Sequence, residues 1–596
     1  MPWTPPESAK TFGFRPLDKG VILSQSSQTL PDGAFVQLDN IIANKEGPRR
    51  RPGFEEFAGG ATTPYRCIDI LTALASDGSL VTFLLTNKVL YTVNARTGLT
   101  EIAWAYDTGT ITVSGATVTG TGTAWTTNDI QPGDLIRVGT EETEIIEVSG
   151  AGTITIESGG LTDGAGLSYS IQRTFSPGTL NAPTWAKTPS GLAIADGKHQ
   201  LLKVDLIALT IDYWTTNAGK QPPNGAVIPA VVGYFSDRVY QGNVIDPVDG
   251  TQRARILWST LADETDFSFP ENYTDLPYSG GSLLRIIGLN KYLMVYFDDA
   301  IYTGYPTNYP TLPFRFERKE TGGIGLGGVR AVTAYLGGHF FIGQNDFYFT
   351  DGDQLKGIGD PIAKDLMQTL EYPEWSYCCP DPLNFNILFG VSGTSAKIER
   401  IWRWDYRSNS WSRDPISTEM LSNPRVNSAL TWDELTGTWD TLGTTYSSWD
   451  TIRVRDSQRR VIIENAGAIW RGSLDGRLDF GNAPVQVEIV TKDHDFDDPD
   501  GLKVFTRFGL KIDSYTLLTN TLTFNVYVSK DRGRTYKSAG ILTIPIGKDE
   551  GYVNFRATGS TLRIRLTSTS EVLSYYIAEY TLRAIGFGEE LDTSTH

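Results

Sequence analysis

The sequence is short of the residue types that build metal and redox sites. Its 596 residues include only three cysteines, Cys67, Cys378 and Cys379, and two of these are adjacent. An odd number with this spacing is a poor disulfide framework, so we expect free thiols and assembly in a reducing compartment. The four histidines lie far apart, and no His/Cys cluster has the spacing of zinc ligands. The composition therefore predicts neither a metal nor a cofactor.

Long apolar runs are also missing. No run approaches the roughly 20 apolar residues of a membrane span. The first residues, MPWTPPESAKTFGF, lack the charged and then apolar layout of a signal peptide. We expect a soluble chain that has no membrane span and no ordinary export signal.

Positive charge is scarce relative to negative charge. The 52 Lys and Arg residues against 69 Asp and Glu residues give a formal net charge of −17. A protein that grips DNA by its phosphates needs a basic face, so this balance argues against that class. It does not argue against a protein that lets DNA pass, because an acidic wall repels a polyanion.

Helix signals are few, whereas strand and turn signals are many. The best helix candidate is 361–370, PIAKDLMQTL, with proline at a favourable first position. Seven segments have β-rich flanks around a polar turn, which predicts hairpins. They are 81–94, 191–205, 231–244, 293–305, 340–353, 398–414 and 461–476. Such repetition indicates an irregular β-propeller, and two or three stacked sandwiches are the alternative.

Two segments interrupt this pattern. Segment 107–174 is almost free of Lys and Arg and alternates with period two, which predicts an inserted small β-barrel or sandwich. Long alternating strands near the end of the chain predict a β-sandwich of jelly-roll type. The fold class is therefore all-β. The expected division is an extended N-terminal arm over 1–64, a first propeller part over 65–106, the inserted domain over 107–174, the remaining propeller over 175–476, the sandwich over 477–587 and a tail over 588–596.

Candidate chemical sites are weak. Segment 529–536, SKDRGRTY, has the Asp-box pattern of sialidase propellers, which closes a hairpin and performs no catalysis. Loop 493–501, DHDFDDPDG, has five aspartates, so calcium is an open alternative to a solvated acidic loop. Acid pairs such as Asp298–Asp299 and Asp263/Asp266 could be imagined as glycosidase carboxylates, but acids at hairpin tips are usually solvated. We expect no enzyme.

Three Trp-Asp pairs follow one another in segment 431–450. Their tryptophans, Trp432, Trp439 and Trp449, are spaced too closely for propeller repeats of the WD type. We expect a self-packed surface loop, in which each indole buries area and each aspartate caps a turn. A contact of these aromatics with host glycan is the alternative.

The order of several motifs resembles the tail nozzle proteins of short-tailed bacteriophages, also called tail tubular protein B. The motifs are LDNIIANKEGPRRRPGFEEF (38–57), RILWSTLADETDF (255–267), NDFYFTDGDQLKGIGDPIAKDL (345–366), the Trp-Asp loop and the final sandwich with its S-x-D-x-G hairpin. The resemblance implies a virion protein that forms a six-subunit ring at the distal end of the tail, below the adaptor ring. It implies a bore that retains and then conducts the genome, and sides that dock fibres or spikes.

Within this resemblance, the basic run EGPRRRPGF suggests an interface. Arg49, Arg50 and Arg51 lie between two prolines, and alternation would send Arg50 opposite to its neighbours. We expect them to form ion pairs with acidic surface on the same or the next subunit, since the planar guanidinium binds carboxylates in bidentate fashion. A DNA-facing role is the alternative. Two rival functions also remain, a receptor-binding fibre-type protein and a virion-associated glycan hydrolase.

Overall fold

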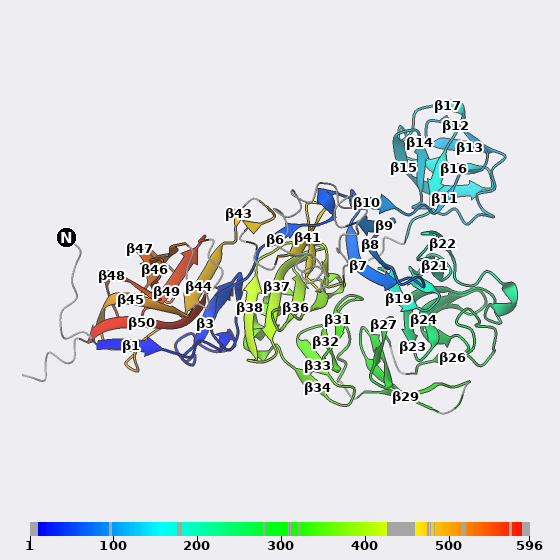
Figure 1. Cartoon of the computed structure of the whole chain (residues 1–596). Coiled ribbons are helices and arrows are strands. Elements are labelled where there is room, and N and C mark those ends of the chain that lie inside the picture. Colours follow the sequence, from blue (N-terminus) through cyan, green and yellow to red (C-terminus); the bar gives the residue numbers. More distant parts are fainter. Residues whose placement is uncertain are drawn as a thin grey trace, which may run out of the picture. The chain divides into compact units, whose positions relative to one another are not determined.

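The computed structural model describes residues 10–586 except for 95–97, 176–181, 278–279, 308, 310, 320–321, 426–458, 474–475, 477, 482, 514–519 and 571–574. The chain divides into two compact units. Residues 1–57, 330–423 and 459–596 form one, here called the sandwich unit, and residues 58–329 and 424–458 form the other, here called the insert unit. Nearly all regular structure in the described residues is β, so the chain is an all-β protein (Figure 1).

The insert unit contains four sheets of four antiparallel strands, each a simple meander. The first has β7 (Cys67–Leu74), β8 (Leu80–Thr86), β9 (Leu90–Asn94) and β10 (Gly98–Glu101), and the second has β19 (Thr184–Thr188), β20 (Gly191–Ala195), β21 (Leu202–Val204) and β22 (Ile211–Tyr213). The third has β23 (Ile228–Phe235), β24 (Arg238–Asp246), β25 (Gly250–Trp258) and β26 (Tyr273–Asp275), and the fourth has β27 (Leu283–Leu289), β28 (Tyr292–Phe297), β29 (Ile301–Pro306) and β30 (Phe314–Arg318).

Successive sheets of this unit pack face to face. One apolar cluster joins the first and second sheets through residues such as Phe83 and Leu192. A second cluster joins the second and third sheets, and a third joins the third and fourth. Successive packing of four-stranded meanders is typical of propeller blades, so the sheets of this unit agree with the propeller-like fold expected from the hairpins.

An inserted domain follows the first sheet. Eight strands form one continuous order, β11-β18-β14-β15-β16-β13-β12-β17. Their bounds are β11 (Ala105–Tyr106), β12 (Thr110–Ser114), β13 (Thr117–Thr121), β14 (Leu135–Val138), β15 (Glu141–Gly150), β16 (Thr153–Ile156), β17 (Gly164–Leu167) and β18 (Ser170–Gln172). The strands surround one core centred on Trp125, whose indole donates to the Tyr169 hydroxyl at 3.0 Å. The alternating sequence thus forms a small β domain with its own core.

The sandwich unit holds three further four-stranded arrays of the same kind. They are β31 (Val332–Tyr335), β32 (Gly338–Ile342), β33 (Phe347–Thr350) and β34 (Leu355–Gly357); then β35 (Tyr377–Asp381), β36 (Asn386–Ser392), β37 (Ile398–Asp405) and β38 (Ser410–Asp414); then β39 (Leu421–Ser422), β40 (Ile462–Asn465) and β41 (Ala468–Gly472) with β6 (Phe54–Glu56). Between the first two lie the 3₁₀ turn Asp360–Ile362 and the helix α1 (Ala363–Thr369), where the sequence predicts a helix.

A β-sandwich completes this unit. Its smaller sheet has the order β1-β50-β45-β48, with β1 (Lys10–Phe14), β45 (Lys503–Asp513), β48 (Glu550–Gly559) and β50 (Tyr576–Gly586). Its other sheet comprises β44 (Val487–Thr491), β49 (Arg563–Ser568), β46 (Leu522–Ser529) and β47 (Lys537–Ile544). Strand β3 (Ala34–Asp39) pairs with β44 on one side and β38 on the other, so one ten-stranded sheet runs from a blade into the sandwich.

The N-terminal segment is therefore more than the extended arm expected from its prolines. Strand β1 pairs with β50, β3 joins two sheets, and β6 pairs with β41 across more than 400 residues of sequence. The prolines fall between these short strands, where they do not remove a ladder hydrogen bond. The expected tail over 588–596 lies outside the described residues.

A buried histidine in the sandwich predicts a dependence of stability on pH. The imidazole of His494 lies 4.4 Å from the Phe14 ring and 3.3 Å from the Tyr580 hydroxyl. Burial, helped by nearby Lys492, lowers the pKa of His494 to about 3. Between about pH 6.5 and pH 3 the unfolded chain thus binds a proton that the folded chain does not, so stability is lost as pH falls through this window.

We therefore expect the unfolding free energy to fall by about 2 kcal/mol through His494 when the pH is lowered from 7 to 5. Denaturant titrations of the parent chain and of His494→Gln at both pH values measure this contribution. The variant should lose less stability on acidification than the parent does. An equal loss in both would show that His494 is not the titrating group.

Candidate functional site

The three consecutive arginines take three different partners within the sandwich unit. Arg49 and Arg50 form the short strand β5 (Arg49–Arg50), which pairs with β4 (Ile41–Ile42). Arg49 donates to the Asn384 side chain at 2.6 Å, and Arg50 donates to the Ser570 carbonyl. Arg50 and Arg51 are each 1% exposed. Two of the three candidate interface residues are therefore buried within the sandwich unit of their own chain.

Arg51 forms the bidentate ion pair that the sequence led us to expect, and its acceptor belongs to the same chain. Its two terminal nitrogens donate to the carboxylate of Asp479 at 2.8 and 2.7 Å. Its Nε donates to the Asn40 side chain at 2.9 Å and lies 3.5 Å from Asp414. The guanidinium also lies over the Phe54 ring, at 5.2 Å. Arg51 thus ties the N-terminal segment both to the last strand of a blade and to the short strand β42 (Leu478–Asp479), which precedes the sandwich.

The ionic contacts continue beyond Arg51. The other oxygen of Asp414 accepts from Arg403, which also donates to Asp381. Burial alone would lower the pKa of Arg403, but these two carboxylates outweigh it and raise that pKa. We call Arg51, Asp479, Asp414, Arg403 and Asp381 the arginine clamp. Each cation in it has carboxylate partners, which is the condition under which buried charge is tolerated.

Strand β3 is fixed by a related pair. Arg413 on β38 binds both oxygens of Asp39 at 2.8 and 3.0 Å. Asp39 and Arg413 are also the residues through which β3 and β38 are paired. A charge-assisted bidentate contact therefore supports the junction between blade and sandwich, where the backbone pairing is brief.

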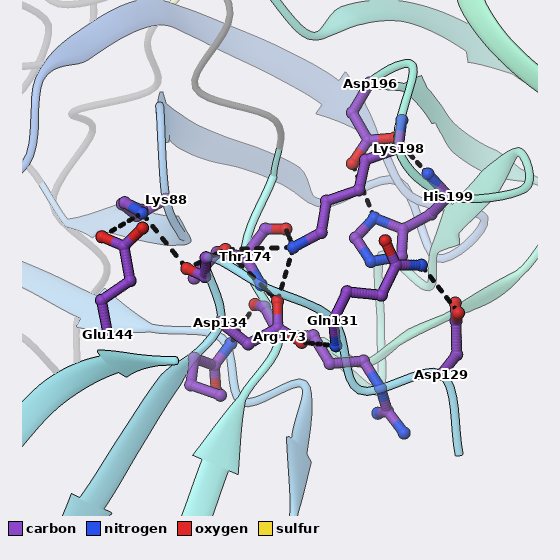
Figure 2. Close-up of polar contacts among 12 residues, drawn as sticks. Lys88, Asp129, Gln131, Asp134, Glu144, Arg173, Thr174, Asp196, Lys198 and His199 are labelled. Atoms are coloured by element: carbon purple, nitrogen blue, oxygen red, sulfur yellow. Dashed lines mark hydrogen bonds and ion pairs between the residues drawn. The ribbon is translucent and has the colours of Figure 1, made fainter. Parts of the chain in front are cut away.

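A second polar joint anchors the inserted domain to the first two sheets of the insert unit (Figure 2). Lys198, in the β20–β21 turn, reaches Asp134 of the inserted domain at 2.6 Å and the Thr174 carbonyl at 3.1 Å. Asp134 is fully buried and also accepts from the backbone N–H groups of Gln131 and Thr174. Lys88, in the β8–β9 turn, pairs with Glu144 at 2.9 Å. We call this set the insert joint.

The same view shows a buried Asp-His pair (Figure 2). His199 Nδ1 lies 2.7 Å from Asp196, whose other oxygen accepts from the backbone of Lys198 and His199. Such a pair orients the imidazole in hydrolases. Here Nε2 has no hydrogen-bond partner among the described residues, and the Trp104 ring lies 4.8 Å from the imidazole ring. Within the described chain the pair therefore lacks a nucleophile and serves the tight turn that places Lys198.

The acidic pairs considered as catalytic carboxylates hold turns. Asp263 accepts from Lys220, Thr265 and the Thr265 backbone, which together lower its pKa to about 2. Asp298 accepts from the Ser282 backbone, and burial with neighbouring Asp299 raises its pKa. The printed hydrogen bonds of Asp263 and Asp298 thus stabilise the turns in which they lie.

The remaining candidates are placed as follows. Asp531 of the Asp-box segment closes the β46–β47 hairpin by accepting from Ser529 and Thr535. Asp493 of the acidic loop is bound by Arg563 at 2.9 and 2.8 Å. Trp432, Trp439 and Trp449 lie outside the described residues. Across the described residues, no group of three or more His, Cys, Asp or Glu side chains is positioned to hold a metal ion.

The sequence did not reveal most of the partners in the arginine clamp and in the insert joint. Asp479 and Asp414 lie more than 360 residues from Arg51, and Lys198 lies 64 residues from Asp134. The one available signal was position, because Lys88 and Lys198 occupy the turns of two predicted hairpins. No helix in the described part of the chain is long and apolar enough to cross a bilayer.

Fold and joints together define an all-β protein of propeller-type sheets with a small inserted domain and a terminal sandwich. No family model matches the chain, and no curated protein matches it. Among solved structures it is similar to PorZ, a surface component of the type-IX secretion system of Porphyromonas gingivalis, at 8% identity and a TM-score of 0.29 over 75% of this chain and 44% of PorZ. It is also similar to YCF48 bound to a D1 peptide, at 10% identity and 0.27 over 63% of this chain and 96% of that one.

A third similar structure is an exo-β-1,3-galactanase from Phanerochaete chrysosporium with galactose. The identity is 9% and the TM-score 0.21, over 62% of this chain and 99% of that one. These scores carry no information about activity.

Proposed function

We propose that this chain is the tail nozzle protein of a short-tailed bacteriophage. In that role it forms, with copies of itself, the distal ring through which the genome is retained and then ejected. The ring is a hexamer, is seated on the tail adaptor, and carries fibres or spikes on its sides. The proposed role is structural and needs no catalytic group.

One observation carries this proposal: polar residues in the motifs of the resemblance form hydrogen bonds and ion pairs within the chain. Arg51 of the GPRRRPGF motif is buried in the arginine clamp. Asp263 of the second motif holds a turn, and Asp346 of the third accepts from the Phe347 backbone. In each case the polar group that marks the motif holds the fold together. Such a pattern suits a protein that bears mechanical load.

Charge is consistent with the proposed conduit. Six chains at −17 would carry a formal charge of 6 × (−17), or −102, around one channel. A polyanion passing such a wall makes few phosphate contacts and no base contacts, so it is not held. The alternative is a receptor-binding protein that uses Trp432, Trp439 and Trp449 against host glycan.

Loss of the protein from the particle tests the role. Phage grown without the gene product should package DNA and then lose it, because the distal closure is absent. The matched control is a particle complemented with the parent chain. A receptor-binding protein predicts particles that keep their DNA and fail to adsorb, and a glycan hydrolase predicts particles that adsorb but no longer degrade polysaccharide. Either result would contradict the nozzle.

A further inference from the structure

One end of the sandwich carries a dense basic hairpin on an otherwise acidic chain. The loop between β46 and β47 presents Lys530, Arg532 and Arg534, and Lys537 begins β47; all four side chains are exposed. With Asp531 as the one acidic residue, segment 530–537 has a formal charge of 4 − 1, or +3. None of the four cations forms an ion pair with a residue that the structure describes.

The hairpin is rigid enough to present these charges in a fixed arrangement. Asp531 accepts from Ser529 Oγ at 2.7 Å and from the Thr535 backbone at 2.9 Å, and the Gly533 N–H donates to Ser529 Oγ at 2.8 Å. Gly533 has φ of 86°, and a side chain there would meet Arg563. The one carboxylate of the hairpin, that of Asp531, is thus hydrogen-bonded within the hairpin, while the four cations face solvent.

A dense acidic loop lies at the same end of the sandwich. Segment 495–500 contains Asp495, Asp497, Asp498 and Asp500, a formal charge of −4, and the last three are exposed. Both loops adjoin the turn that follows β48. Lys530 packs by Gly559, and Lys503, which pairs with Asp498, lies 3.5 Å from the Ser560 carbonyl. Leu502, next to the acidic loop, is 57% exposed.

We infer that this end of the sandwich is a contact between copies of the chain, in which the basic hairpin 530–537 of one copy binds the acidic loop 495–500 of another. The two loops carry opposite and nearly equal charge. They belong to one sandwich, yet the described residues show no ion pair between them. The four hairpin cations, and Asp497 and Asp500 of the acidic loop, are therefore available to a partner. The exposed Leu502, which follows the acidic loop in sequence, adds apolar area of the kind that protein interfaces commonly bury.

A second copy fits this surface better than nucleic acid does. A phosphate backbone would be attracted to the hairpin but repelled by the acidic loop beside it. A copy of the same end satisfies both loops at once. Exposed ion pairs contribute little singly, so the contact between two chains should be weak and sensitive to salt. This inference does not depend on the location of the protein in a phage tail.

Charge exchange tests the contact. The basic-loop variant is Arg532→Glu/Arg534→Glu, and the acidic-loop variant is Asp497→Lys/Asp500→Lys. Sedimentation velocity of the full chain at about 50 mM salt should show self-association of the parent that weakens as salt rises. Each variant alone should associate at least about ten-fold more weakly than the parent, since like charges then face each other. A one-to-one mixture of the two variants should recover the association of the parent.

Two controls keep the result specific. Lys511→Glu/Lys548→Glu makes the same change of charge at exposed sites elsewhere on the sandwich and should leave association unchanged. Lys530→Glu/Lys537→Glu repeats the basic-loop test at different residues, in case the first variant fails to fold. A parent chain that stays monomeric at low salt overturns the inference. Loss of association without recovery in the mixture overturns it too, and loss of duplex-DNA binding by the basic-loop variant alone would assign the hairpin to nucleic acid instead.

Discussion

Replacing Arg51 by alanine is expected to lower the unfolding free energy of the sandwich unit by about 3–5 kcal/mol. The guanidinium is buried and serves Asp479 and Asp414 together, and Asp414 is itself fully buried. Removal leaves carboxylates without their cation in a site from which water is excluded, and the cost of that exceeds the loss of the hydrogen bonds themselves. Chemical denaturation followed by tryptophan fluorescence measures the change.

Arg49→Ala is the matched control for this variant. Arg49 is partly exposed and donates to the neutral Asn384, so its removal should cost about 1 kcal/mol. The double variant Arg51→Met/Asp479→Asn removes both charges of the closest pair and should recover part of the loss. Equal stability of Arg49→Ala and Arg51→Ala would contradict the arginine clamp.

The second large effect is expected at Lys198. Lys198→Met leaves buried Asp134 without its cation and should destabilise the attachment of the inserted domain by about 3 kcal/mol. The domain has its own core around Trp125, so it should stay folded while its joint opens. Hydrogen exchange should therefore accelerate at residues 131–134 and 172–175, with little change in β12 or β13.

Two lysines serve as comparisons for Lys198. Lys88 pairs with Glu144, which is 55% exposed, so Lys88→Met should have a smaller effect, about 1 kcal/mol. Lys203 lies on the neighbouring strand β21 and forms no ion pair with a described residue, so Lys203→Met should leave exchange at the joint unchanged. Exchange that spreads through the whole insert unit in Lys198→Met would mean that the domain is not a separate module.

Local features of the fold could be predicted because their causes are local. A turn such as Ser236–Asp237 joins strands that are adjacent in sequence, and the alternating pattern on each side determines which face is buried. All seven predicted hairpins occur where the sequence indicated them. The short helix α1 follows from a proline at its start, in the same way.

The long-range pairings could not be predicted in this way. Strand β6 completes a sheet with β41, and nothing in FEE at positions 54–56 marks that partner. The partners in the arginine clamp could not be predicted either, because an arginine-rich turn indicates that carboxylates are needed but not which ones. The sequence could predict ion pairs with carboxylates of the same or the next subunit, but not the burial of Arg50 and Arg51, which depends on segments that reach them only in the folded chain.

The arginine clamp and the insert joint both bear on the proposed function. In the proposed role the subunits must stay folded against the pressure of a packaged genome, and the arginine clamp ties the N-terminal segment to carboxylates more than 360 residues away in the sequence. The inserted domain is attached to the first two sheets of the insert unit through side chains such as Lys198, Lys88 and Arg137. In the proposed role it is a site at which a nozzle acquires contacts with fibres or spikes.

The most direct test of the proposed role is the location of the protein on the particle. Gold-labelled antibody against this chain, viewed on intact virions by electron microscopy, should label the tip of the tail on the particle axis. A six-fold reconstruction of that tip would then show the closure. Label on lateral fibres, or no label on the particle, would contradict the nozzle and would favour receptor binding.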